Sequence, residues 1–323
     1  MDYSIIIRTL GNAEKKYERL LESINKLEPP PKEVIVVIPE GYPLPKEKLG
    51  YETFYFSPKG MVKQRLYGIQ KCKTQYALIC DDDITFSSDF VVKLHEPIKK
   101  GICNISAGPL LSFLPKRGFE SLFHALTGAA IPKLFDDGKY ISVLPTSGYS
   151  YNRNIDTDSR NYYEAESLPW TCFYADIDAL KKIKMEDEYW LDEHGYAAMD
   201  DLTMFYKAKI LGIKTMVVSD AIYQHLDART SRNREEVKKQ VAFCLEYNRY
   251  IFWHRFIYSQ DKGLKKFIDM LCFRYYYLAK EFYFVLQRVR GNLSEDGYAE
   301  KHNAIRQAKM YLKSEEYKRL PKV

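Results

Sequence analysis

The stretch "YALICDDDITF" (Tyr76 to Phe86) leads an apolar run directly into three adjacent carboxylates. The apolar run predicts a buried strand, whose alternating side chains would put Asp81 and Asp83 on one side and Asp82 on the other. Like charges held close together resist joint ionisation unless a cation is present. Carboxylate oxygens at a strand end suit Mg²⁺ or Mn²⁺ shared with phosphate oxygens. The stretch therefore predicts a cation site, although a solvated turn before a helix would use the same residue types.

The residues before this stretch read as strands and helices in alternation. Apolar runs at 3–9, 33–38 and 51–56 predict strands, and apolar residues at helical spacing predict helices over 17–24 and 62–69. Continuous apolar strands separated by amphipathic helices predict a parallel sheet that is covered on both faces. Ligands of such sheets bind beyond the carboxyl ends of the strands, and the triplet lies at such an end.

The middle of the chain is less regular. Residues 101–166 are rich in Gly, Pro and Tyr, with an extended pair expected within 140–154. A short strand leading into a helix is expected over 169–183, then a helix over 200–211 that Gly212 ends, and a strand over 213–219. Beyond residue 232 the pattern predicts helices.

Composition restricts the class of protein. The 323 residues are 46% hydrophobic, which is enough for a full core. The start "MDYSIIIRTLGN" reaches Arg8 too soon for an export signal, and no uncharged apolar stretch approaches the length of about 18 residues that a membrane span needs. The six cysteines lack C-x-x-C spacing, which argues against a zinc cage or a disulfide framework. A cytoplasmic protein is expected.

The charge is unevenly distributed. Residues 232–323 contain 20 Lys and Arg against 11 Asp and Glu, a net charge of +9, which leaves −3 for residues 1–231. Aromatic residues interleave with Arg and Lys between Tyr247 and Phe284, a mixture typical of a helix lying on anionic lipid. The alternative is a helical lid packed on the rest of the protein, with its bases in water. No nucleic-acid recognition module is evident, so nucleic acid is not an expected partner.

Two chemistries use a cation at such a carboxylate cluster. In a glycosyltransferase the metal neutralises the diphosphate leaving group of a nucleotide sugar. In a phosphohydrolase of the haloacid dehalogenase type, the D-x-D-x-T signature matched by Asp81, Asp83 and Thr85 would make Asp81 the nucleophile and Asp83 its acid/base partner. That signature normally ends the first strand of its fold, whereas here several elements precede it. A third reading is a non-catalytic protein that binds a nucleotide sugar or a membrane.

Four segments together resemble a family 2 glycosyltransferase of the GT-A fold over residues 3 to about 255. They are "YSIIIRTLGNAEKKYERLLESINKLEPPPKEVIVVIPEG", "GMVKQRLYGIQKCKTQYALICDDDITF" with its D-x-D-type motif, "LPWTCFYADIDALKKI" and "AMDDLTMFYKAKILGIKTMVVSDAIYQH". The resemblance implies an α/β, Rossmann-like mixed sheet flanked by helices, with a C-terminal helical extension. Residues 1–231 would form the catalytic domain, with a nucleotide-sugar half at 1–100 and an acceptor half at 101–231. Residues 232–323 would form the basic, aromatic-rich extension.

The resemblance also implies an activity and roles. The expected reaction is inverting transfer from a nucleotide-diphosphate sugar, expected to be a UDP-sugar, to a hydroxyl of a glycan or lipid-linked acceptor in cell-surface polysaccharide synthesis. Asp81 and Asp83 would hold the nucleotide and the metal, with Asp83 the more direct ligand, and His225 would complete the metal sphere. Of the pair Asp200 and Asp201, the second would be the general base. A carboxylate at a helix N-terminus is expected to stay ionised through the helix dipole, although a plain helix cap looks the same.

The nucleotide pocket is implied by the same resemblance. The residues expected at the nucleotide sugar are Arg8, Thr9, Glu40, Arg65, Asp81, Asp82 and Trp170. The sequence departs from the family pattern at Pro39 and Glu40, where an aspartate pair is frequent, so the identity of the base stays open. Trp170 is expected either to stack on a sugar or to pack in the core. The basic extension would allow this cytoplasmic protein to attach peripherally to the inner face of the plasma membrane.

Overall fold

The computed structural model describes residues 1–111, 119–128, 138–153, 155–226, 235–292 and 294–323. An eight-stranded mixed sheet has the order β3-β2-β1-β4-β10-β6-β11-β9. Its strands are β1 (Tyr3–Arg8), β2 (Glu33–Pro39), β3 (Thr53–Ser57), β4 (Tyr76–Asp81), β6 (Ile105–Ala107), β9 (Tyr162–Glu164), β10 (Cys172–Asp176) and β11 (Thr215–Val218). Two further strand pairs are β5 (Ile84–Phe86) with β12 (Tyr223–His225), and β7 (Ile141–Val143) with β8 (Ser150–Asn152).

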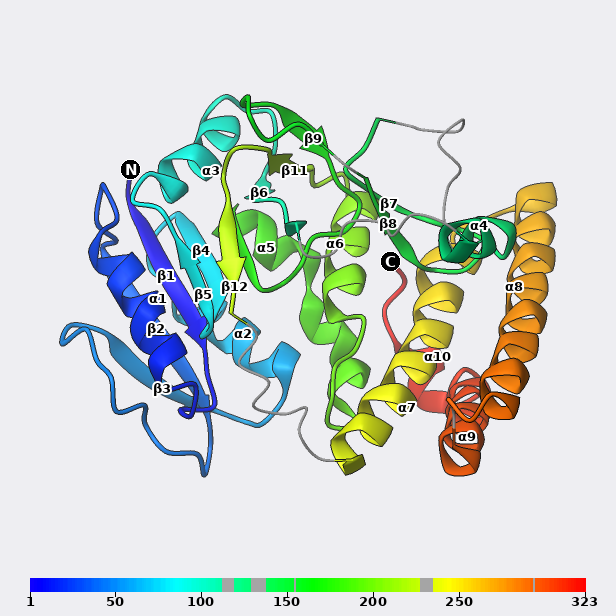
Figure 1. Ribbon diagram of the computed structural model, residues 1–323. Helices are drawn as coiled ribbons and strands as arrows, with labels where there is room; N and C mark the ends of the chain where they lie inside the picture. The colour runs from blue at the N-terminus through cyan, green and yellow to red at the C-terminus, as the bar shows by residue number, and fades with distance from the viewer. Residues whose placement is uncertain (112–118, 129–137, 154, 227–234, 293) are drawn as a thin grey trace.

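The helices fall into two groups (Figure 1). Those associated with the sheet are α1 (Lys15–Asn25), α2 (Met61–Lys71), α3 (Phe90–Lys99), α5 (Ile177–Ile183), the 3-10 helix η3 (Met185–Asp192) and α6 (Asp200–Ile210). Those on the other side of the molecule are α4 (Phe119–Leu126), α7 (Glu235–Phe252), the π-helix η4 (Trp253–Tyr258), α8 (Gly263–Val289), α9 (Glu295–Tyr311) and α10 (Glu315–Arg319). The predicted alternation of strand and helix through β4 is confirmed, as is the extended pair β7–β8.

Side chains of β1 alternate between two cores, because helices cover both faces of the sheet. Ile6 lies in the core that includes Val62 and Leu66 of α2. Ile5 and Ile7 lie in the other core, which includes the apolar face of α1. The parallel pairing of β1 with β2 and β4 matches the sequence pattern.

The strand β10 makes the sheet mixed, because it runs antiparallel to both β4 and β6. It closes the side of β4 away from β1, and Cys172 stands opposite Cys80. On the other side of β4, Arg8 stands opposite Asp81, so the carboxyl ends of β1 and β4 meet. This edge is where the candidate site forms.

The C-terminal helices share a core with the sheet. Phe173 of β10 and Phe205 of α6 belong to the same buried cluster as Phe252 of α7 and Phe256 of η4. The segment from Glu246 to Phe256 is therefore packed against the rest of the protein, as in the lid alternative.

Two further observations concern the whole chain. All six cysteines lie in described residues and are free thiols; five are buried, and Cys272 on α8 is half-buried. Within the described residues, no helix combines the length and the apolar character needed to cross a membrane.

Candidate functional site

Arg8 and Asp81 join the ends of β1 and β4. The Nε and Nη2 atoms of Arg8 each lie 3.1 Å from Oδ1 of Asp81. The main-chain N–H of Asp81 donates to the carbonyl of Thr171, which holds this strand end against the segment entering β10. Asp81 is buried, so its charge is matched by a guanidinium rather than by water.

Arg65 of α2 connects Asp81 to the acidic pair of α6. Its Nη2 lies 3.0 Å from Oδ1 of Asp81, and its Nη1 lies 2.6 Å from Oδ2 of Asp200. The Arg65 side chain is only 3% exposed, and its guanidinium lies 4.7 Å from the ring centroid of Trp170. One planar cation thus fixes two carboxylates that lie 119 positions apart in the chain.

The helix that carries Arg65 begins at a cap supplied from elsewhere. Gly60 at its N-terminus has no side chain to offer, and the main-chain N–H groups of Val62 and Lys63 donate to the carboxylate of Asp192, at 3.3 and 3.1 Å. A side chain at Gly60, whose φ is +154°, would collide with Asp192. Asp192 therefore sets the position of α2. The sequence indicated the need for a cap from elsewhere only through Gly60, which precedes the helix and has no side chain to cap it.

Asp82 pairs with Thr9 rather than with its neighbours. Thr9 donates through Oγ1 to Oδ2 of Asp82 at 2.5 Å. Burial raises the pKa of Asp82 to about 6, although the Thr9 hydrogen bond and the Arg8 charge act in the opposite direction. Thr9 and Asp82, which were both expected at the nucleotide sugar, thus lie side by side in the structure.

Asp83 faces His225. The Nε2 atom of His225 lies 3.2 Å from Oδ1 of Asp83, because β12 pairs with β5 and puts His225 opposite Ile84. The main-chain N–H of Leu226 also donates to the Asp83 carbonyl. A carboxylate oxygen and an imidazole nitrogen this close form a donor pair that suits a divalent cation.

Asp81 does not join that pair as the sequence predicted. The strand β4 ends at Asp81, so the alternation that was to put Asp81 and Asp83 on one side does not continue, and Asp81 meets guanidinium groups instead. Among the described residues, no group of three or more His, Cys, Asp and Glu side chains converges as a metal site.

The acidic pair begins α6, directly after Met199, whose φ of +73° is in the left-handed region. Burial raises the pKa of Asp200, against the opposing charges of Arg65 and Arg8. Burial and the neighbouring Asp200 raise the pKa of Asp201 to about 7. Burial thus opposes the stabilisation of the ionised form that the helix dipole was expected to give.

Of the other two nucleotide-pocket residues, Trp170 lies against Arg65, and Glu40 lies at the surface. Trp170 is 2% exposed and packs in the core under Arg65, which matches the packing alternative. Glu40 is exposed after the end of β2, where its main-chain N–H donates to Ser57. Sequence reasoning also missed Asn248 of α7, which is buried and donates to the carbonyl of Ala198 just before the acidic pair.

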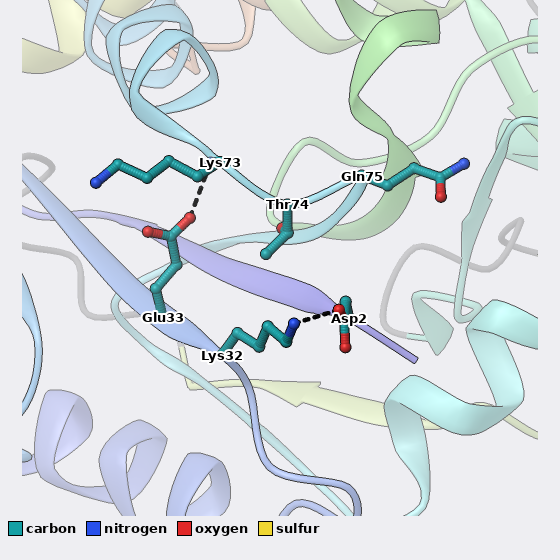
Figure 2. Close-up of a pocket in the computed structure, with 6 residues that line it drawn as sticks. All are labelled: Asp2, Lys32, Glu33, Lys73, Thr74 and Gln75. Carbon is teal, nitrogen blue, oxygen red and sulfur yellow. Dashed lines mark hydrogen bonds and ion pairs between the residues drawn. The ribbon is translucent and has the colours of Figure 1, made fainter.

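A surface pocket of about 390 Å³ lies at the opposite end of the strands (Figure 2). Its lining residues are Asp2, Lys32, Glu33, Lys73, Thr74 and Gln75. Figure 2 shows Lys32 paired with Asp2, and the Lys73 main-chain N–H donating to Glu33. The pocket lies at the amino ends of β1, β2 and β4, away from the carboxylate triplet.

The fold of the chain is similar to that of a solved structure. No protein-family model and no curated protein sequence match the chain. The crystal structure of GalNAc-T7 with UDP, GalNAc and Mn²⁺ is similar over 85% of this chain, with a TM-score of 0.52 and 14% identity. The chain has the GT-A fold. It spans about half of that structure's length, 56%. A crystal structure of a fragment of S. aureus TarS matches 97% of this chain and 91% of its own length, at 15% identity and a TM-score of 0.43.

Proposed function

We propose that the protein is an inverting glycosyltransferase of the family 2 type. The donor is a nucleotide-diphosphate sugar, and the acceptor is a hydroxyl of a glycan or lipid-linked molecule used in cell-surface polysaccharide synthesis. The observation that carries the proposal is the convergence of Arg65, Asp81 and Asp200 at the carboxyl edge of a GT-A sheet. Ligands of such sheets bind at this edge. Residues 1–100 serve the donor, and residues 101–231 serve the acceptor.

The choice of UDP for the donor has separate support. The similar GalNAc-T7 structure contains UDP together with Mn²⁺. In the present chain, Arg8 and Arg65 are the cations nearest the Asp81 carboxylate, and Thr9 and Asp82 offer polar atoms beside them. We assign these residues to the nucleotide, with Glu40 at the rim and Trp170 acting by supporting Arg65.

Asp83 and His225 would hold Mg²⁺ or Mn²⁺. Their oxygen and nitrogen atoms lie 3.2 Å apart, and diphosphate oxygens and water are suitable further ligands for a hard cation. When bound, such a cation neutralises charge on the departing diphosphate. Asp81 is left out of this set, because its carboxylate already accepts hydrogen bonds from two guanidinium groups.

Asp201 is the general base of the proposed reaction. Arg65 binds Asp200, whereas Asp201 makes no salt bridge among the described residues and has a pKa of about 7. A base with a pKa near the working pH accepts a proton efficiently. In its carboxylate form it takes the proton of the acceptor hydroxyl while that oxygen attacks the anomeric carbon. A single displacement of this kind inverts the anomeric configuration.

The phosphohydrolase reading is disfavoured by the position of Asp81. A nucleophilic carboxylate needs an accessible oxygen, but Asp81 is 7% exposed and engaged by Arg8 and Arg65. No observation in the described residues favours a second activity.

Calorimetric titration tests the donor site. UDP, GDP and dTDP are titrated with and without Mn²⁺ into the protein and into Asp83→Asn, with Asp89→Asn as the matched control because Asp89 is an exposed carboxylate before α3. We expect metal-dependent binding of UDP, at least tenfold weaker in Asp83→Asn and unchanged in the control. Absence of binding for all three nucleotides under both conditions would overturn the proposal.

The product tests the reaction. The UDP-sugar that binds is incubated with glycan and lipid-linked acceptors, and the anomeric configuration of the new linkage is read by NMR. An inverted product supports Asp201 as the base. A product that retains the donor configuration would remove that role.

A further inference from the structure

Helix α8 exposes a straight apolar stripe. Its members recur at alternating steps of three and four residues and are each 40 to 80% exposed: Leu264, Ile268, Leu271, Tyr275, Leu278, Phe282, Val285 and Val289. The 27-residue helix is about 40 Å long, and the stripe follows its whole length. The opposite face of the helix is the one that packs inward, with Phe273, Tyr276 and Phe284 buried. The residues of the stripe therefore do not contribute to the core of this chain.

A second helix widens the stripe into a surface. The hydroxyl of Tyr275 donates to the carbonyl of Leu126 at the end of α4, at 3.0 Å. Leu122 and Leu126 of α4 are themselves 55% and 64% exposed. Figure 1 shows α4 beside α8, although about 140 residues separate them in the chain. We call the stripe together with Leu122 and Leu126 the α4–α8 surface. Contiguous apolar surfaces of this kind mark interaction sites.

The exposed charges on α8 itself have one sign, and the exposed Glu295 at the start of α9 pairs with one of them, Arg288. Between residues 261 and 291, all of which the structure describes, every exposed charged side chain is basic: Lys262, Lys265, Arg274, Arg288 and Arg290. The three acidic residues in this range are buried or half-buried, and each pairs with a neighbouring side chain. Asp261 and Asp269 bind Lys265, and Glu281 is half-buried with Tyr298 and His302. The net field along the helix is therefore positive.

We infer that the α4–α8 surface docks on an anionic lipid bilayer, with α8 lying in the plane of the interface. An apolar face bordered by bases is the arrangement that binds such a surface, because apolar burial and attraction to anionic headgroups add. Leu264, Leu278 and Val289 enter the boundary of the acyl chains, and Arg274 and Arg290 reach the headgroups.

The same charges disfavour a second copy of the chain as the occupant. In antiparallel pairing of two α8 helices, Lys262 and Lys265 of one copy approach Arg288 and Arg290 of the other. In parallel pairing each base faces its own counterpart. Like charges along a helix pair are destabilising, whereas an anionic surface neutralises all of them at once. The inference concerns attachment alone and stands apart from the proposed glycosyl transfer.

Sedimentation of the full-length protein with vesicles tests the docking. The protein is mixed with phosphatidylcholine vesicles, either pure or containing phosphatidylglycerol, at low and high salt. We expect binding to the anionic vesicles that weakens at high salt. Each exposed base contributes about fivefold to partitioning, so Arg274→Glu with Arg290→Glu should lower the binding to anionic vesicles at least tenfold. The control is Arg19→Glu with Lys46→Glu, two exposed bases in the sheet half of the chain.

A second pair of variants tests the apolar part. Leu278→Ser with Phe282→Ser removes two exposed side chains of the stripe, and Val92→Ser with Leu211→Ser removes two that are exposed on α3 and after α6. The first pair should weaken vesicle binding at least tenfold, and the second should leave it unchanged. Equal binding to neutral and anionic vesicles, or none to either, would overturn the inference. So would a dimer in sedimentation velocity that the first pair dissolves while vesicle binding persists. Urea unfolding of each variant confirms that it is folded.

Discussion

Asn248 and Ala198 are joined by a buried hydrogen bond, in which Nδ2 of Asn248 donates to the Ala198 carbonyl at 2.8 Å. Ala198 lies two residues before Asp200, and Met199 between them has a left-handed backbone. Helix α7, in the basic tail, therefore holds the turn from which the acidic pair of α6 projects. The tail takes part in the geometry of the candidate active site.

Replacing Asn248 with Ala should misplace the acidic pair. The Ala198 carbonyl would lose its buried donor, which costs about 1 to 3 kcal/mol in the free energy of unfolding. We expect a lower kcat with a nearly unchanged affinity for UDP, measured by steady-state kinetics and calorimetry. Gln240→Ala is the matched control, because Gln240 makes a similar but exposed bond from α7 to the His194 carbonyl. Equal kcat values for the two variants would contradict the positioning role.

Replacing Arg65 with Met should destabilise the protein strongly. Asp81 and Asp200 would remain buried without this guanidinium, and breaking a buried ion pair by removing one partner costs about 3 to 5 kcal/mol. Urea unfolding measures the loss. Arg160→Met is the control, since Arg160 is 38% exposed and pairs with Asp220 at the surface; there the expected loss is below about 1 kcal/mol.

The Arg65 prediction has an internal check. The triple variant Arg65→Met, Asp81→Asn, Asp200→Asn removes the carboxylate charges together with the cation. It should recover part of the stability lost in Arg65→Met, because the two carboxylates no longer carry buried charge, and it recovers only part because Arg8 loses its partner Asp81. A triple variant that is no more stable than the single one would show that the unpaired carboxylates are not the source of the loss.

Asp201→Asn should lower turnover and remove a pH dependence. With the pKa of Asp201 at about 7, kcat/KM of the wild-type protein should rise with pH and level off above about 7. The variant should be about 10²-fold to 10⁴-fold slower, with no such rise. Asp158→Asn, at an exposed carboxylate between β8 and β9, should keep the wild-type profile.

The same carboxylate links stability to pH. Its pKa is raised above the ordinary value of 3.8, so the folded protein retains a proton that the unfolded chain releases between about pH 4 and pH 7. This contribution to stability is present at low pH and is lost as the pH rises through about 7. Asp201→Asn should therefore be more stable than the wild type at pH 8 by roughly 1 to 2 kcal/mol, since partial exposure screens the charge. The gain should vanish near pH 4, as measured by thermal unfolding.

Gly60→Ala should displace helix α2. The added methyl group would collide with the Asp192 carboxylate that caps the helix, and the backbone conformation disfavours a side chain. We expect a loss of about 2 kcal/mol or more and weaker UDP binding, because Arg65 lies on this helix. Gly101→Ala is the control, with a φ of +69° and open space around it. Its stability should fall by about 1 kcal/mol, with UDP binding unchanged.

The strands and helices of the sheet half could be predicted from the sequence, because their apolar residues recur at regular spacing. Buried strands such as Ile5 to Ile7 and a helix face such as Leu20 and Leu21 carry local patterns that tertiary packing does not override. The antiparallel insertion of β10 was not readable from that pattern, since a short apolar strand looks the same in either direction. The resemblance to GT-A enzymes implied the mixed sheet.

The candidate site was only partly readable. Asp83 and His225 meet as expected, because the β5–β12 pairing joins the segments that the resemblance marked. The ion pairs of Asp81 were not readable, since no local rule reveals that Arg8 and Arg65 converge on it from other elements. The pKa of Asp201 depends on burial, which a sequence does not state.

The cysteine distribution provides an intrinsic probe of the lipid-facing helix. Five of the six thiols are buried, and Cys272 sits on α8 beside Leu271 of the apolar stripe. A thiol reagent under native conditions should therefore modify Cys272 long before the others, whose reaction must wait for local opening. A polarity-sensitive dye attached there would report, by its emission alone, whether α8 leaves water when vesicles are added.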